Sequence, residues 1–178
     1  MPEDARLTGD ERFTVLDAPV REFWAYALSS LQANTARGLL AEYLVAKAVG
    51  AAGPRVEWDA FDVLTPEGTT IEVKTSGYSQ VWLRTGAPVI SFSGLPGRPG
   101  KRSWHAATNT MGPAHIADVY VFAVHTTTQD EPYDGLDIAK WQFYVLSGET
   151  VMATGQGTMR LSTVERLGGR AVALGRPS

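Results

Sequence analysis

Three charged residues that could bind a metal ion and move a proton lie close together in the sequence. Asp62, Glu72 and Lys74 flank or follow the segment Pro66-Glu67-Gly68. That segment is typical of a three-residue hairpin loop, because proline fixes φ near −65° and glycine adopts positive φ without cost. In the register that such a loop sets, Asp62 faces Glu72, and Lys74 follows on the same face. Two carboxylates and an ammonium group should therefore converge on one side of a hairpin.

The predicted hairpin covers residues 58–75. In the same register, Phe61 faces Val73 and Val63 faces Ile71. Successive side chains of a strand point to opposite faces, so these four apolar residues should share the core face. The charged face is then free to form a site.

Asp59 competes with Asp62 for the role of the first carboxylate. The apolar alternation changes between Trp58 and Phe61, which predicts a bulge or bend at 59–60. In the predicted register Asp59 lies on the core side, facing Thr75. Asp62 is therefore preferred, unless the bulge reverses the direction of Asp59.

The types of these residues restrict the metal. Two hard carboxylates suit Mg²⁺ or Mn²⁺, which prefer oxygen ligands. The chain has no cysteine and only 3 histidines, without the spacing of zinc ligands, so a zinc site is disfavoured. The simpler alternative is an ordinary ion pair of Lys74 with Glu72 or Asp62, which contributes little to stability on a surface.

Two helices should precede the hairpin. Apolar residues at helical spacing predict a core-covering helix over 18–33, and Asn34-Thr35 can cap a second helix that runs to Val49. The second helix is apolar nearly all round and carries Glu42. A buried carboxylate needs a partner, because an unpaired buried charge is costly. That partner could be a basic residue such as Lys47, or a metal ion with its water.

Strands and a long loop should follow the hairpin. The segment 94–117 is expected to be mainly loop, and a short helix should begin at Ser162 and end at 168–169. Strands are predicted over 89–92, 119–124 and 141–146, the second of them buried on both faces. Basic and aromatic residues near the long loop could hold a phosphate backbone, or could simply be solvated. They are Arg84, Arg98, Lys101, Arg102 and Trp104.

Length and composition indicate one α/β domain over 1–178, in which 1–16 form a loose lead-in. Apolar residues make up 44% and charged residues 20%, as in soluble globular proteins. No apolar run suggests a membrane span, and the absence of cysteine fits a cytoplasmic protein. The net charge of −3 does not favour nucleic-acid binding, since phosphate binders usually have a basic surface.

These residues together resemble the PD-(D/E)XK superfamily of nucleases, also called restriction-endonuclease-like. The match lies in Glu42 on a helix, Asp62 on the next strand and Glu72-Val73-Lys74 on the strand after it. Phe61 stands where the superfamily name has proline. Gln80 matches a glutamine that some branches carry shortly after the lysine.

The resemblance implies a fold, a site and partners. The fold is a three-layer α/β core with a mixed sheet of about four to five strands between helices. Asp62 and Glu72, with the Val73 carbonyl, would bind Mg²⁺ or Mn²⁺, and Glu42 would bind a second metal or its water. Lys74 would orient or deprotonate the attacking water, and Gln80 would be a further catalytic residue.

The implied activity is Mg²⁺-dependent cleavage of DNA by an endonuclease. Cutting both strands commonly needs two sites, so a homodimer or a separate specificity subunit is a partner to consider. Two alternatives remain: a non-catalytic nucleic-acid-binding or assembly module on this fold, and a globular domain with ordinary ion pairs.

Overall fold

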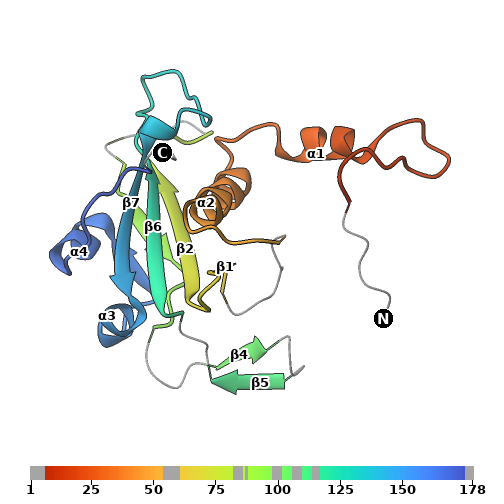
Figure 1. The fold of residues 1–178 in the computed structure, drawn as a ribbon. Coiled ribbons are helices and arrows are strands. Elements are labelled where there is room, and N and C mark those ends of the chain that lie inside the picture. The colour runs from red at the N-terminus through yellow and green to blue at the C-terminus, as the bar shows by residue number, and fades with distance from the viewer. Residues whose placement is uncertain are drawn as a thin grey trace.

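A computed structural model describes residues 7–53, 61–81, 86, 88–97, 102–105, 110–113 and 117–174, with the backbone alone at 102–105 and 111–113. Figure 1 shows the arrangement of its elements. The helices are α1 (Val20–Leu28), α2 (Asn34–Ala48), α3 (Gly148–Ala153) and α4 (Leu161–Arg166), with a 3₁₀ turn at Ile138–Lys140. The strands are β1 (Val63–Leu64), β2 (Thr70–Gly77), β3 (Ser91–Ser93), β4 (Arg102–His105), β5 (Thr110–Pro113), β6 (Val119–His125), β7 (Trp141–Ser147) and β8 (Thr158–Arg160).

Four strands form a mixed central sheet in the order β1-β2-β6-β7. β2 and β6 run parallel, while β1 and β7 are antiparallel to their neighbours. β6 is buried from Tyr120 onward, which confirms the strand predicted from an unbroken apolar run. The predicted mixed sheet is therefore present.

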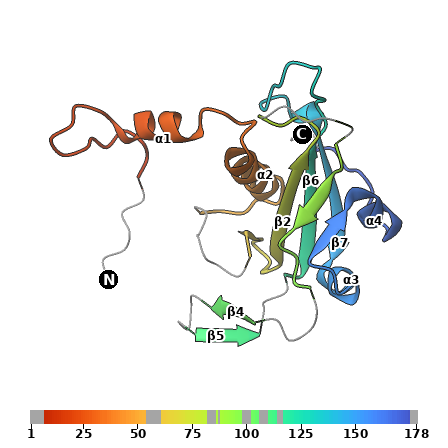
Figure 2. The same ribbon diagram turned by 180° about the vertical axis from the view of Figure 1, so that it is seen from behind.

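Helices cover both faces of this sheet. On one face Ala41 and Val45 of α2 pack against Val73 and Val121. On the other face α3, α4 and the β3–β8 ribbon pack around Phe122. Figures 1 and 2 show α2 on the opposite side of the sheet from α3 and α4. These layers confirm the predicted three-layer α/β core.

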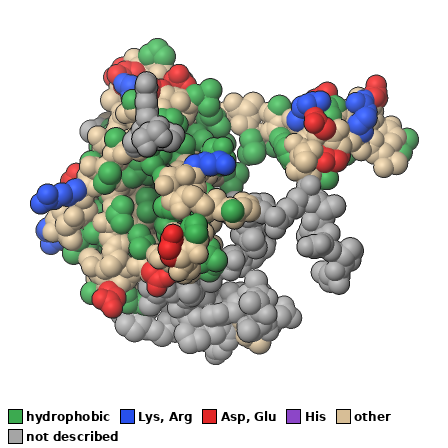
Figure 3. Space-filling view, in the orientation of Figure 1, with side chains coloured by type: hydrophobic (Ala, Val, Ile, Leu, Met, Phe, Trp, Pro, Cys, Tyr) green, Lys and Arg blue, Asp and Glu red, His purple; other side chains and the backbone are tan. Residues whose placement is uncertain are grey.

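The first helix is not where the sequence pattern predicts. α1 is shorter than the expected 18–33 and projects away from the body (Figure 1). Val20 is its buried residue, and Tyr26 is 88% exposed. Figure 3 shows acidic and basic side chains side by side on this arm, where Arg21 pairs with Asp10 at 2.6 Å. The prediction that this helix covers the core was wrong. An apolar stripe shows that a helix has an apolar face, but it does not determine whether that face packs against the core of the same chain.

The region after the hairpin has more structure than predicted. Within the expected loop 94–117, β4 and β5 pair as an antiparallel hairpin. α3 was not predicted, whereas α4 begins within one residue of the predicted start and is followed by Gly168 at φ +102°. Strands this short, with glycine and proline among them, give little periodic signal. Among the described helices, none is long and apolar enough to cross a membrane.

Candidate active site at the edge of β2

The loop between β1 and β2 forms the turn that its sequence predicts. Gly68 has φ +90°, and its N–H donates to the Thr65 carbonyl at 2.9 Å. The Thr65 N–H donates to the Thr69 carbonyl, also at 2.9 Å. Val63 then pairs with Ile71, as the turn chemistry predicted. The turn thereby determines which β2 side chains lie on each face of the sheet.

The β1–β2 ladder stops at Val63, and the residue before it, Asp62, donates its N–H to the Ile71 carbonyl at 3.0 Å but meets Val73 with its side chain. Asp62 Oδ2 accepts a hydrogen bond from the Val73 N–H at 2.7 Å. The Val73 N–H, which could donate to a backbone carbonyl of the partner strand, thus donates to a side-chain carboxylate. The chain bends here, and Phe61 packs in the cluster on the opposite face. The predicted facing pairs Phe61–Val73 and Asp62–Glu72 were therefore wrong.

Glu72 and Lys74 lie on one face of β2 and form an ion pair, in which the side chains are 20% and 18% exposed. Tyr120 of β6 lies beside Glu72 in the parallel register. Burial, and then the negative charges of Glu72 and Asp62, raise the pKa of Tyr120 to about 12. Asp62 is not paired with Glu72 in the ladder, but its carboxylate lies against the backbone of Val73, the residue that follows Glu72.

A cavity of about 220 Å³ opens beside Lys74 at the edge of β2. β1 has only two residues, so within the described part of the chain no strand pairs with this edge beyond Ile71. Glu42 reaches the cavity from α2, and β3 lines it from the other face of the sheet. The lining residues are Asn34, Gly38, Glu42, Val73, Lys74, Thr75, Ser91, Phe92 and Ser93.

Glu42 and Lys74 therefore line the same cavity although they lie on different elements. Glu42 is half-buried on α2, whose C-terminal limit agrees with the prediction. The ammonium group of Lys47, which was considered as its partner, lies 5.4 Å from the centre of the Tyr43 ring. Gly94, with φ +74°, lies beside Lys74, and an added Cβ at this position would be 3.5 Å from Lys74 Nζ.

A second cavity of about 280 Å³ adjoins the first, and sequence reasoning did not anticipate it. It is lined by Asn34, Arg37, Thr75, Ser76, Gln80, Val89 and Ser91. Gln80, predicted to be catalytic, lies here with Arg37 and does not line the Lys74 cavity. The available signal was Arg37 itself, a charged residue at the start of an otherwise apolar helix.

The predicted nucleic-acid-binding residues are only partly described. Arg84, Arg98 and Lys101 lie outside the described residues. Arg102 and Trp104 belong to β4, of which the backbone alone is described. Asp59, the competitor of Asp62, also lies outside them.

The donor set fits a hard divalent cation. No group of three or more His, Asp or Glu side chains that could hold a metal is found among the described residues. Mg²⁺ does not require one, since it is usually bound by one or two carboxylates together with waters and substrate phosphates. Asp62 and Glu72 can supply those carboxylates, because the Asp62 carboxylate accepts from the N–H of Val73, which follows Glu72 on β2.

Comparison with known proteins gives one family. Its model, described as bacteriophage T4 endonuclease IV, matches residues 26–159. The matched range contains α2, the whole central sheet and the residues that line both cavities. No curated protein matches the chain.

Proposed function

The chain belongs to the bacteriophage T4 endonuclease IV family, and on this basis we propose that it is a Mg²⁺-dependent endonuclease that hydrolyses phosphodiester bonds of DNA. The observation that carries the proposal is the cavity that Lys74, paired with Glu72, shares with Glu42. A protein that only bound nucleic acid would not need these charged groups together at an open sheet edge. The proposed site is of the PD-(D/E)XK type.

Asp62 and Glu72, with the Val73 carbonyl, are the residues that we assign to Mg²⁺ or Mn²⁺. When bound, the cation supplies positive charge beside the phosphate and makes water more acidic. The hydrogen bond from the Val73 N–H orients the Asp62 carboxylate just before the start of β1. Glu42, on the opposite wall, would hold a second cation or a water molecule.

Lys74 has two roles in this proposal. Its ammonium group offsets the negative charge that develops on the phosphate, and it orients the attacking water or accepts its proton. The ion pair with Glu72 holds the side chain at the cavity. Glycine at position 94 leaves the space beside Nζ open.

The test is cleavage of plasmid, linear, branched and single-stranded DNA in the presence of Mg²⁺. Lys74→Ala should lower the rate by about 100-fold or more, the usual contribution of a positioned acid or base. Lys47→Ala, which removes an exposed lysine from α2, should cut like the wild type. Equal rates for Lys74→Ala and the wild type would contradict the proposal. DNA that is bound but never cut would favour a non-catalytic binding module.

Metal binding can be tested separately from cleavage. A cation that binds only the folded chain raises its stability, by about 2.7 kcal/mol at a concentration 100 times its dissociation constant. We expect Mg²⁺ or Mn²⁺ at millimolar concentration to raise the Tm of the wild type, and to do so less for Glu72→Gln. No increase for the wild type would count against a metal site.

A further inference from the structure

Arg37, at the start of α2, is 3% exposed. Within the described part of the chain, no Asp or Glu forms an ion pair with it. Its Nη atoms donate to three neutral oxygens: Ser79 O at 3.0 Å, Asn34 Oδ1 at 2.5 Å and Gln80 Oε1 at 3.3 Å. Its Nε is buried without a hydrogen-bond partner. These hydrogen bonds hold the guanidinium group but do not neutralise its charge.

The surrounding segment fixes this guanidinium in place. Gln80 Nε2 donates to the Gly77 carbonyl at 3.1 Å. The Gln80 carbonyl in turn accepts from Gln32 at 3.1 Å and from Gln129 at 3.2 Å. A Cβ at Gly77 would lie only 2.8 Å from Arg37 Nη1, so glycine is required for this close contact. A positive charge is thus pre-positioned inside the protein.

The cost of this arrangement points to an anionic ligand. Arginine stays protonated in proteins, and a buried charge is unfavourable unless an opposite charge accompanies it. Burial lowers the pKa of Arg37, which reflects the same unfavourable environment. An anion bound near Arg37 would offset the cost of burying its positive charge.

The cavity that Arg37 lines has the polar groups to hold such an anion. Hydroxyl and amide side chains make up most of its wall, and none of the described residues that line it carries a carboxylate. The positive end of the α2 dipole lies here too, since the helix begins at Asn34 and no side chain caps it at Ala33. Asn34, Thr75 and Ser91 also line the Lys74 cavity, so the two spaces are adjacent.

We propose that the Arg37 cavity binds a backbone phosphate of the substrate strand, next to the phosphate that is cut beside Lys74. This inference rests on the proposed function, because it takes nucleic acid as the substrate. Arg37 is then a binding and positioning residue, and Gln80 orients it. Such a subsite gives an acidic protein a local positive site for a phosphate backbone.

The first experiment places a negative charge in the cavity without removing any hydrogen bond of Arg37. Val89 lines the cavity and is 56% exposed, so Val89→Glu should fold. The control is Val145→Glu, which makes the same change of charge at a 47% exposed position on β7, away from both cavities. Binding of a duplex oligonucleotide is measured without Mg²⁺ over a range of salt concentrations.

Loss of one phosphate contact should make the negative slope of log K against log[salt] less steep by about 0.9. We expect this change for Val89→Glu, whereas Val145→Glu should keep the slope of the wild type. Equal slopes for the two variants would overturn the inference, because a purely structural Arg37 contributes nothing to this slope.

The second experiment uses inorganic phosphate alone and so does not depend on DNA binding. Phosphate should raise the Tm of the wild type and of Val145→Glu, and raise that of Val89→Glu much less. Arg37→Lys keeps the charge but loses the planar fork, so its increase should be intermediate. The same increase in all four proteins would overturn the inference.

The outcomes separate this inference from the proposed function. Cleavage that requires Lys74 and Mg²⁺, with equal salt slopes for both glutamate variants, would overturn the subsite alone. Phosphate stabilisation that Val89→Glu abolishes, in a chain that never cuts DNA, would support an anion site and contradict the proposed activity.

Discussion

The ammonium group of Lys74 has Glu72 as its ion-pair partner and Gly94 as a second neighbour. Glu72 forms an ion pair with it and holds the side chain at the cavity. Gly94 lies on the other side of Nζ, and its φ of +74° favours glycine over residues that carry a Cβ. A side chain at position 94 would therefore lie directly beside the ammonium group, since its Cβ would be 3.5 Å from Nζ.

The space beside Lys74 can be tested with two nearly identical substitutions. Asparagine and aspartate both tolerate positive φ better than most residues, so Gly94→Asn and Gly94→Asp should be about equally stable. Only the second places a carboxylate near Nζ, since a Cβ at this position lies 3.5 Å from it. Gly94→Asp should cut DNA at least about 10-fold more slowly than Gly94→Asn, because the new carboxylate neutralises Lys74 and repels phosphate. Similar rates would show that this side of Lys74 is not used.

At the scale of elements, the end of β1 depends on one side chain. The Asp62 carboxylate accepts from the Val73 N–H at 2.7 Å and so terminates the β1–β2 pairing. The same residue is proposed to bind the metal. Its structural and chemical roles can be separated, because an amide oxygen can accept this hydrogen bond but carries no charge.

Asp62→Ala leaves the Val73 N–H without its acceptor, which should lower the free energy of unfolding by about 1 kcal/mol or more. Asp62→Asn keeps an acceptor and should lose less. Urea unfolding without metal measures this difference. In the presence of Mg²⁺, both variants should show a smaller increase in stability than the wild type. If Asp62→Ala unfolds at the same urea concentration as Asp62→Asn, the hydrogen bond does not stabilise the end of the strand.

The features that the sequence predicted correctly depend on local chemistry. The turn at Pro66-Glu67-Gly68 sets the register by its backbone angles, and the apolar run of β6 is buried because the sheet is covered on both faces. The end of α2 follows from Gly50, which has φ +68°, whereas the predicted cap at Asn34-Thr35 was wrong, because no side chain caps the helix start and Asn34 instead accepts from Arg37. A short helix–hairpin unit also brings Glu42 and Lys74 to one cavity, where Lys74 pairs with Glu72.

The features that were missed depend on long-range contacts or on competition between side chain and backbone. The Asp62 side chain accepts from the Val73 N–H of β2, and Phe61 packs on the face of the sheet opposite to the predicted one. Arg37 is held by Ser79 and Gln80, 42 and 43 positions away, which no local pattern encodes. The helical spacing of α1 was identified, but its position outside the core was not.

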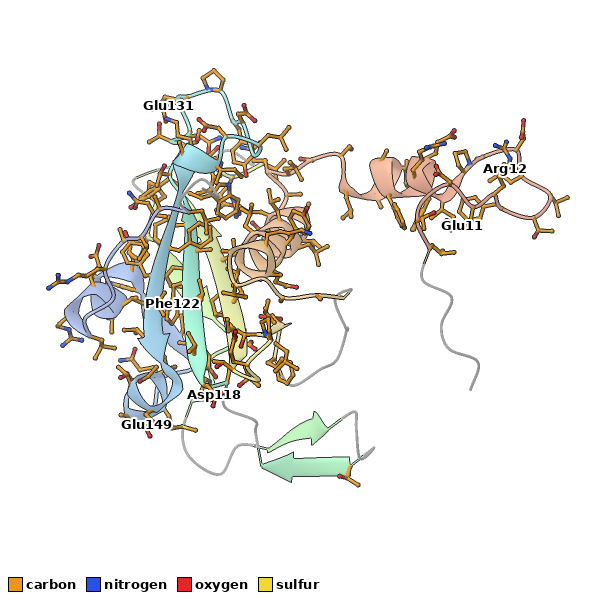
Figure 4. The ribbon with its side chains drawn as sticks, viewed as in Figure 1. Glu11, Arg12, Asp118, Phe122, Glu131 and Glu149 are labelled. Atoms are coloured by element: carbon orange, nitrogen blue, oxygen red, sulfur yellow. The ribbon has the colours of Figure 1, made fainter. Side chains whose placement is uncertain are left out.

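At the scale of the whole molecule, charge is distributed unevenly around an acidic chain. The net charge is −3, yet Lys74 and Arg37 line adjacent cavities on one edge of the sheet. Asp118 and Glu149, labelled in Figure 4, lie near the end of the sheet where β6 begins and β7 ends. In the proposed function, recognition of a phosphate backbone would depend on these local cations rather than on the total charge.

Global stability should depend on pH through one buried histidine. His125 is fully buried between Tyr133 and Trp141, with ring centroids 4.3 Å and 5.0 Å away. Burial lowers the pKa of His125, and the positive charge of Arg37 lowers it further. A hydrogen bond to the Asp134 carbonyl, with the charges of Asp134 and Asp137, opposes this shift without reversing it. The imidazole is therefore neutral in the folded protein at neutral pH.

The sign of the pH effect follows from this lowered pKa. Below about pH 6.5, the unfolded chain protonates His125 while the folded chain does not, so unfolding becomes easier as the pH falls toward the folded pKa. The slope for one proton cannot exceed about 1.4 kcal/mol per pH unit. Urea unfolding at pH 7.5, 6.5 and 5.5 measures this slope, and His125→Phe should show a weaker pH dependence of stability in this range.

The carboxylates with lowered pKa values, Glu11 and Glu131, affect stability only at more acidic pH. An unchanged pH dependence in His125→Phe would mean that other groups, and not the ring packed against Trp141, set the acid sensitivity of the fold.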